Sequence, residues 1–307
     1  MSRVAGFTRR VFVQLGIHVN DFTWSGGSPA IATTLASIAQ GVEAAGFSTL
    51  SVMDHFFQIH GPPENDMLEA YTTLGFVAAK TQKLRIGTVV TGVTYRHPGL
   101  LVKNVTTLDV LSGGRAFFGV GAAWFEGEHL GLGVPFPPLK ERFERLEETL
   151  KIAHQMWSGD ETPFNGNYYQ LARPMCHPMP LQKPHPTIVI GGSGERKTLK
   201  LVAQYADACN IFERIGPDEL RHKLAVLREH CDAIGRPYDS IVKGVNGRLL
   251  VTRDGRAGSD SPAAVIDRFG RLRELGFTWV NVSIPNASEP GAFDLIGSDI
   301  IPAIQKL

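Results

Sequence analysis

The sequence predicts an α/β fold, a closed (β/α)8 barrel built as a single domain from residues 1–307. Short apolar runs alternate eight times with longer segments of helical pattern, and this alternation is typical of parallel sheets. A chain of 307 residues suits eight such units. Many of the 33 glycines follow apolar runs, where strands turn into helices. A doubly wound open sheet is the alternative, but the Gly-x-Gly-x-x-Gly turn that often follows its first strand is missing.

The individual elements follow from local pattern. β-branched and aromatic residues dominate the expected strands, which cover residues 11–17, 49–53, 84–90, 115–120, 187–190, 208–212, 241–251 and 279–284. The expected helices between them are longer, and glycines such as Gly46 and Gly113 end two of them. These helices cover residues 31–45, 68–80, 100–111, 198–205, 218–233, 263–275 and 292–305.

One further helix, over residues 139–157, is expected to pack on the outside of the barrel. Apolar residues recur there at alternating steps of four and three, at Leu139, Phe143, Leu146, Leu150, Ala153 and Trp157. This spacing places them on one helix face, while acid-first charge pairs occupy the opposite face.

Two long loops interrupt the alternation of strands and helices, one after the second strand and one after the fourth. Residues 56–67 extend the first, and the proline-rich residues 159–186 extend the second. Within the second, residues 164–169 predict a small hairpin around an Asn-Gly turn. Long ordered loops in a compact domain are usually lids or binding loops, so neither is interpreted as a domain linker.

The composition of the chain excludes several classes of function. The formal net charge of +1 argues against a nucleic-acid partner, which favours a basic surface. No apolar run approaches the roughly 20 residues of a membrane span. Residues 1–10 lack the apolar segment of a secretory signal, and the three cysteines have no metal or redox spacing. The expected location is therefore the cytoplasm, and the expected partner is a small-molecule substrate.

Functional groups of such a barrel collect at the carboxyl ends of its strands. Asp54 and His55 end the second strand, where they need not face the same way. His55 is a candidate proton donor near neutral pH; a capping Asp beside a packed His is the structural alternative. His18, Asp54, His55 and His97 lack any known metal-ligand spacing, so no metal is predicted.

A glycine-rich turn follows the fifth strand at Gly191, Gly192, Ser193, Gly194 and Glu195. Glycines let backbone amides approach a ligand, and a helix beginning near Glu195 would direct its free N–H groups at the same point. The two cations that follow would favour an anion such as phosphate. A tight turn without a ligand is the alternative.

Two other strand ends are distinctive. Gly121, Ala122 and Trp124 follow the fourth strand, where small residues admit a flat ring and an aromatic side chain can border it. The same small residues also fit a crowded barrel rim. Arg96, after the third strand, is interpreted as a structural ion-pair partner.

Several of these segments, in this order, resemble the bacterial luciferase-like superfamily of flavin- and deazaflavin-dependent oxidoreductases, and within it the branch that uses coenzyme F420. The resemblance extends from the first strand to the last helix. The matching stretches are residues 51–57 around Asp54-His55, 87–98, 107–115, 119–122 and 191–193.

The resemblance implies cofactor contacts from Asp54, at the polar edge of the deazaflavin, and from Val89, Val90, Thr91 and Gly92, behind its ring. It implies a non-prolyl cis peptide at Val89–Val90. Gly121 and Ala122 would also contact the cofactor. The glycine turn that ends at Glu195 would hold the phosphate of the cofactor tail.

The resemblance further implies that His55 lies near the reacting ring face and is the catalytic proton partner. The expected function is an F420-dependent oxidoreductase that transfers a hydride between the cofactor and a small organic substrate. An FMN-dependent monooxygenase and a non-catalytic flavin- or deazaflavin-binding protein are the alternatives. Family habit suggests a homodimer.

The sugar-phosphate dehydrogenases of this family carry an acidic residue where this chain has Trp124, so oxidation of a glucose-phosphate substrate is not expected. Glu126 and Glu128 follow a little later, on the next segment of helical pattern.

Overall fold

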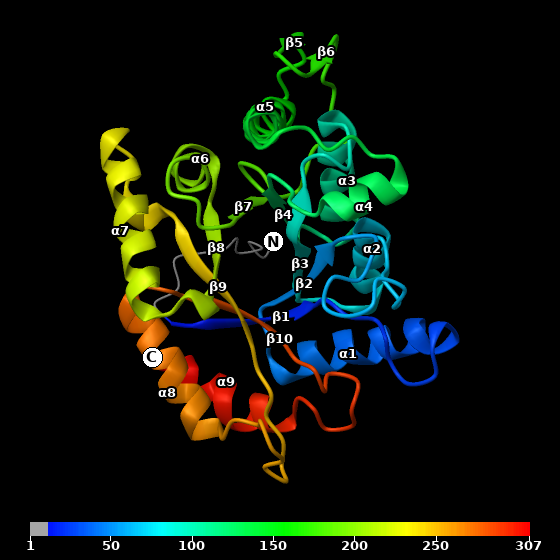
Figure 1. The fold of residues 1–307 in the computed structure, drawn as a ribbon, viewed down its shortest axis with the longest axis vertical. Coiled ribbons are helices and arrows are strands. Elements are labelled where there is room, and N and C mark those ends of the chain that lie inside the picture. The colour runs from blue at the N-terminus through cyan, green and yellow to red at the C-terminus, as the bar shows by residue number, and fades with distance from the viewer. Residues whose placement is uncertain (1–11) are drawn as a thin grey trace.

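A computed structural model describes residues 12–307. Within these residues the main sheet is a closed barrel of parallel strands in the order β1-β10-β9-β8-β7-β4-β3-β2 (Figure 1). The predicted barrel is confirmed. Its strands are β1 (Gln14–Val19), β2 (Thr49–Asp54), β3 (Arg85–Gly92), β4 (Ala116–Gly121), β7 (Thr187–Gly191), β8 (Ala208–Phe212), β9 (Val242–Arg248) and β10 (Trp279–Ser283).

Helices surround the strands on the outside of the barrel (Figure 1). They are α1 (Ile31–Ala45), α2 (Ala70–Lys80), α3 (Pro98–Leu111), α4 (Glu126–Leu132), α5 (Leu139–Ser158), α6 (Thr198–Tyr205), α7 (Pro217–Ala233), α8 (Pro262–Leu275) and α9 (Ile301–Ile304). Three of them begin one or two residues earlier than predicted, at Pro98, Pro217 and Pro262. Proline suits the first helical turn because its missing N–H group has no helical partner there.

Three predicted elements have an end that differs by three or more positions from the structure. The strand predicted over residues 11–17 begins at Gln14, and Val11 lies outside the described residues, as does the segment 1–10. β9 ends at Arg248 rather than residue 251, because β10 also ends opposite it, at Ser283. The helix predicted over residues 292–305 is instead a π-helical turn, Ile296–Ile300, followed by the short α9. Pro302 near the start of α9 has no N–H group for the regular helical ladder.

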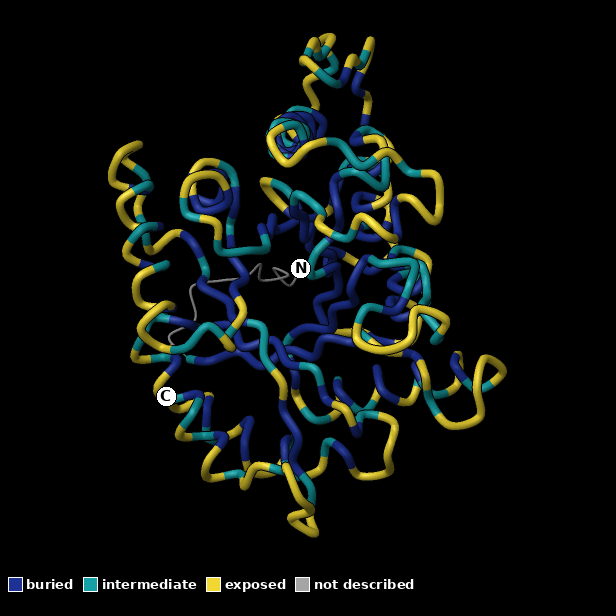
Figure 2. The backbone as a smooth tube through the Cα atoms, in the orientation of Figure 1, coloured by how far each residue is buried: buried dark blue, intermediate teal, exposed yellow. Residues whose placement is uncertain are grey.

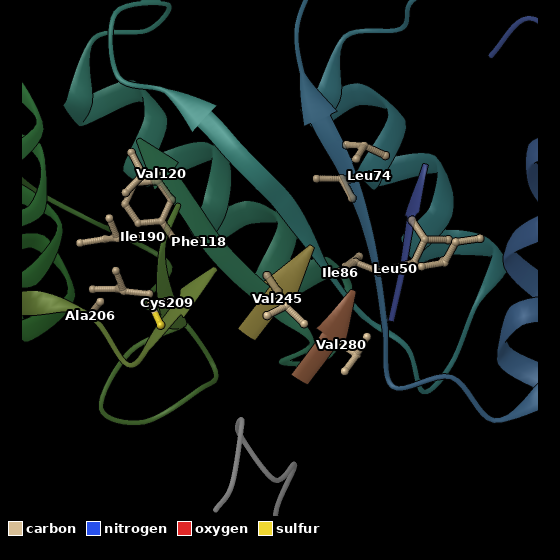
Figure 3. Packing of buried hydrophobic residues seen from close by; sticks show 14 of the residues in the cluster. Leu50, Leu74, Ile86, Phe118, Val120, Ile190, Ala206, Cys209, Val245 and Val280 are labelled. Atoms are coloured by element: carbon tan, nitrogen blue, oxygen red, sulfur yellow. The ribbon is translucent and has the colours of Figure 1, made fainter. Parts of the chain in front are cut away.

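The hydrophobic core has two parts. Alternate strand residues such as Leu50, Ile86 and Phe118 face outward and pack beneath the helices in one large cluster, part of which Figure 3 shows. A smaller cluster of Phe117, Val189, Ala208 and Trp279 fills the barrel interior. The dark inner region of Figure 2 corresponds to these strands, and the exposed residues lie mainly on helices and loops. The alternation therefore identifies which strand side chains point into the barrel.

Both predicted long loops are present. Residues 55–69 connect β2 to α2, and the connection after β4 carries α4, α5 and an antiparallel hairpin of β5 (Phe164–Asn165) and β6 (Gln170–Leu171). The hairpin loop is wider than the predicted two-residue turn: the amide of Gly166 donates to the carbonyl of Tyr169 at 2.9 Å. The buried carboxylate of Glu148 accepts from the loop amides, which stabilises this wider loop.

The three cysteines, Cys176, Cys209 and Cys231, are buried free thiols. Among residues 12–307, no helix is sufficiently long and apolar to cross a membrane.

Candidate active site

Asp54 and His55 point to different sides of the barrel wall. Asp54 follows the outward residues Leu50 and Val52 in the alternation of β2, and its side chain has no exposed surface. Both of its carboxylate oxygens accept from the guanidinium of Arg96, at 2.6 and 3.0 Å. The Asp54 oxygens are therefore both held by Arg96 in this structure, and the cofactor contact predicted for Asp54 stays a prediction.

Arg96 is the centre of a cluster between β2, β3 and α2. Besides Asp54 it pairs with Glu69, and its guanidinium lies 4.9 Å from the centre of the Tyr71 ring. The hydroxyl of Thr91 is 2.9 Å from that of Tyr71, so Thr91 also faces the helices. Burial opposes the charge of Arg96, but Asp54 and Glu69 outweigh this effect and raise the pKa of Arg96. The predicted ion-pair role of Arg96 is confirmed.

His55 is paired with Glu128, a residue that the sequence analysis assigned no role. Nδ1 of His55 lies 3.0 Å from Oε2 of Glu128. A carboxylate can only accept, so Nδ1 carries the hydrogen and Nε2 is the remaining nitrogen. No described residue forms a hydrogen bond with Nε2 of His55, and the side chain is 11% exposed. The geometry thus leaves one imidazole nitrogen available to a ligand.

Glu128 is fully buried, and its carboxylate accepts several hydrogen bonds. Its carboxylate accepts from His55, from the hydroxyl of Tyr95 and from the amides of Phe56 and Phe57. Burial alone would raise the pKa of Glu128, but these hydrogen bonds outweigh it and lower the pKa. Glu128 is therefore an anion that holds the beginning of the β2 loop in place.

The short helix α4 carries Glu128 to His55. The neighbouring His129 is buried, donates from Nδ1 to the carbonyl of Phe125 at 2.7 Å and lies 2.6 Å from the hydroxyl of Thr94. Trp124, which precedes the helix, is 63% exposed and its ring meets that of His55 edge-on at 5.8 Å. The one sequence signal for Glu128 was its place in the first turn of a helix that follows a strand end.

The peptide Val89–Val90 is cis, which confirms the prediction. The register of β3 shifts against both neighbouring strands at this point. Val89 packs against the interior cluster, and a Cβ atom on Gly121 or on Gly191 would lie within 2.9 Å of a Val90 methyl group. The bulge therefore turns both valines toward the interior, and the two glycines make room for Val90. Gly92, by contrast, lies beneath the ring of Tyr95.

The glycine turn after β7 leads into α6, which spans the predicted residues 198–205. The earlier start near Glu195, considered for the turn itself, is not observed. Gly192 has φ +114°, a conformation that glycine adopts readily. A Cβ on Gly194 would lie 3.0 Å from the Thr198 hydroxyl and 4.0 Å from its amide nitrogen. The bare glycine thus keeps the front of the helix N-terminus open, as a bound phosphate requires.

The charged residues of this turn divide in two. Glu195 pairs with Lys223 and His222 of α7, so its side chain is directed away from the turn. Arg196 and Lys197 are exposed, and no carboxylate among the described residues pairs with them. The turn therefore combines free backbone donors with two available cations, which fits a phosphate group.

The interior side of the mouth opposite Val89–Val90 is polar. Nδ1 of His18 lies 3.0 Å from the hydroxyl of Ser51, which accepts from Asn281 at 3.0 Å. Asn281 also donates to Asn246 at 3.1 Å. Burial, with smaller effects of His60 and His55, lowers the pKa of His18 to about 3, so its imidazole is neutral. Among residues 12–307, no three His, Cys, Asp or Glu side chains are placed to hold a metal ion.

A separate groove of about 710 Å³ lies between α1 and residues 287–298. None of the predicted site residues lines it. The chemistry-bearing groups are therefore those of the barrel mouth.

Comparison with known proteins identifies the family of this chain. The sequence profile of the luciferase-like monooxygenases matches residues 14–278, from the beginning of β1 to the residue before β10. The chain belongs to this family. The match to the luciferase-like monooxygenases therefore covers His55, Glu128, the Val89–Val90 bulge and the glycine turn.

Within curated luciferase-like relatives, the F420-dependent glucose-6-phosphate dehydrogenase of Nakamurella multipartita is 33% identical over 215 residues. The alignment covers 67% of this chain and 60% of that protein, so the chain spans less than two thirds of the relative's length. The FMNH2-dependent dimethylsulfone monooxygenase of Pseudomonas putida is 31% identical over 156 residues, 51% of this chain and 42% of that protein.

Among solved structures, the F420-dependent tetrahydromethanopterin reductase of Methanopyrus kandleri superposes with a TM-score of 0.79 at 19% identity. The superposition covers 95% of this chain and 99% of that protein. At this identity the likeness establishes the shared barrel fold.

Proposed function

We propose that this protein is an F420-dependent oxidoreductase that transfers a hydride between the deazaflavin and a small organic substrate at the barrel mouth. The observation that carries the proposal is that His55, held by Glu128, follows β2, the Val89–Val90 bulge lies in β3 and the open glycine turn follows β7, all within one run of neighbouring barrel strands, β2-β3-β4-β7. An alignable relative is an F420-dependent dehydrogenase, which favours this cofactor.

The residues present fit such a cofactor. Val90 offers an apolar surface over Gly121 and Gly191 for a flat ring, and Val89 packs against the interior cluster. The turn before α6 offers free amides and the cations Arg196 and Lys197 for a phosphate-bearing tail. When bound, the deazaflavin supplies the centre that gives or takes the hydride.

The role of the protein's own groups is to move the accompanying proton. If the substrate were an alcohol, the cofactor would supply the hydride acceptor and Nε2 of His55 would take the O–H proton. The reverse transfers reduce the carbonyl. Glu128 accepts from Nδ1 and stabilises the imidazolium that forms, because the negative charge is already in place.

An FMN-dependent monooxygenase is the second candidate, because the dimethylsulfone monooxygenase relative aligns over half of this chain. A binding protein without turnover is the third. His55 with a free Nε2 favours an enzyme. Oxidation of a sugar phosphate is not proposed, because the resemblance places Trp124 where the sugar-phosphate dehydrogenases of the family carry an acidic residue.

A parallel titration tests the cofactor assignment. Purified protein is added to F420 and, separately, to FMN, and the change in cofactor fluorescence is followed. We expect saturable binding of F420 at lower concentration than FMN. Preferential binding of FMN would replace the proposal with the monooxygenase alternative, and binding of neither would remove it.

We further infer that the protein works as a homodimer in a reducing cytoplasm. Leu100 and Leu111 lie three turns apart on α3 and are 67% and 74% exposed. Exposed apolar side chains of this kind on one helix favour an interface. Light scattering of the wild type and of Leu111→Glu tests the dimer: the wild type should have twice the chain mass and the variant half of that.

A further inference from the structure

Asn210 on β8 carries a buried hydrogen-bond donor without a partner. The residue is 5% exposed, and its Nδ2 atom has no acceptor within the described residues. Its side chain lies on the same strand face as Ala208, which belongs to the interior cluster. Leaving a buried amide donor unsatisfied destabilises the folded protein, so such groups usually meet a ligand or an ordered water.

The neighbouring strands offer Asn210 no side chain. Its register partners are Gly191 on β7 and Gly244 on β9. The space over Gly191 belongs to Val90, and the space over Gly244 belongs to the Trp279 ring. The Asn210 amide therefore lies in the barrel interior between an apolar residue of the bulge and an aromatic ring.

Two other interior amides, Asn246 and Asn281, are bonded to one another. Asn281 uses both hydrogens of its Nδ2, toward Ser51 and toward Oδ1 of Asn246. The acceptor of Asn246 is thereby occupied. His18, Ser51, Asn246 and Asn281 thus form a belt of hydrogen-bonded side chains. Asn210 is a buried amide outside this belt.

The belt consists of amides, one hydroxyl and the neutral His18. An anion buried there would lack a cationic partner, which is strongly unfavourable. A neutral carbonyl oxygen is therefore the acceptor that fits Asn210.

We propose that Nδ2 of Asn210 donates to a carbonyl oxygen at the pyrimidinedione edge of the cofactor ring. This rests on the proposed function and adds a contact that the sequence analysis had given to Asp54. Asp54 is committed to Arg96 outside the barrel, whereas Asn210 is the direct register partner of Gly191 and neighbours the Val90 surface against which the ring is proposed to lie.

The test compares cofactor affinity with stability for Asn210→Leu and Asn210→Asp. F420 is titrated by fluorescence without substrate, so that a carbonyl of the substrate cannot contribute. Both variants should bind F420 about tenfold more weakly than wild type, as expected for a lost buried hydrogen bond. Without cofactor, Asn210→Leu should melt at or above the wild-type temperature, since an unsatisfied polar group has been removed.

Gln182→Leu is the matched control. Gln182 is a buried amide near the amino end of β7, and its hydrogen bonds to Asp109 and Ala116 are made. That variant should melt lower and bind F420 like the wild type.

Three outcomes overturn the inference while the wild type still binds F420. They are unchanged affinity in Asn210→Leu, a clear loss of melting temperature in Asn210→Leu without cofactor, and wild-type affinity in Asn210→Asp, which would make Oδ1 an acceptor. A wild type that fails to bind F420 refutes the proposed function instead.

Discussion

Nδ1 of His55 lies 3.0 Å from Oε2 of Glu128, although the two residues are 73 positions apart in the chain. The pair joins the loop after β2 to the helix after β4. It also fixes which imidazole nitrogen carries the hydrogen, because a carboxylate cannot donate. Glu128 is thus a positioning residue for His55.

Glu128→Gln should therefore impair turnover more than binding. An uncharged amide no longer stabilises the imidazolium and no longer enforces one tautomer, so we expect kcat to fall by about tenfold or more. KM and the F420 dissociation constant should change much less, and the pH profile of kcat should shift. In a His55→Ala background the same substitution should cost little further activity, and additive losses would contradict the positioning role.

His55→Ala should retain F420 binding within about tenfold, roughly 1.4 kcal/mol. Turnover should fall by about a hundredfold or more, because acid–base help develops mainly in the transition state. Fluorescence titration and single-turnover kinetics separate the two effects. Normal turnover with lost binding would show that His55 is a cofactor ligand.

Gly194→Ala should weaken F420 binding by about tenfold, because its new Cβ would lie over the N-terminus of α6. Gly192 is a poorer position for this test, since its φ of +114° would strain any other residue. Gly270→Ala, where an added Cβ meets open space, is the control. A deazaflavin lacking the phosphate tail should bind Gly194→Ala and wild type equally; unequal binding would place the phosphate elsewhere.

Asp54→Ala should lower the free energy of unfolding. Removing one partner of a buried ion pair leaves Arg96 uncompensated, which costs about 3 kcal/mol. Glu69 retains contact with Arg96, so the protein should still fold. Denaturant unfolding measures the loss, and the F420 affinity of the folded variant should stay near that of the wild type. A stable variant with weak F420 binding would restore the cofactor contact first predicted for Asp54.

His18 should make the protein acid-sensitive. Burial lowers the pKa of His18 in the folded protein from its usual 6.5 to about 3, so the unfolded chain binds the extra proton between these values. Stability from the neutral His18 is present above pH 6.5 and is lost as the pH falls toward 3. Between pH 7 and pH 5 this loss is about 2 kcal/mol. Urea unfolding of wild type and His18→Gln at both pH values measures this loss. Between pH 7 and pH 5 the free energy of unfolding should fall by about 2 kcal/mol less in the variant than in the wild type. An equal fall in both proteins would contradict the expectation.

The fold could be predicted from the sequence because the patterns that indicate its strands and helices are local. Strand alternation, helical spacing and glycine at helix ends depend on neighbouring residues, and they predicted the barrel strands to within a few positions at most ends. The family resemblance added the cis peptide Val89–Val90, which the structure contains. The ends of β9 and of the last helix were wrong, since neighbouring strands and a proline decided them.

The candidate site could be predicted from the sequence only in part. The sequence by itself determined which chemical groups stand at the strand ends: Asp54, His55, the bulge and the glycine turn. Tertiary structure alone decided that Asp54 turns outward to Arg96, that Glu128 reaches His55, and that Asn210 is left with a free donor between two glycines. The physical reason is that strand register, and not local pattern, decides which side chains meet across a barrel mouth, and register is fixed only when all the strands close around one interior.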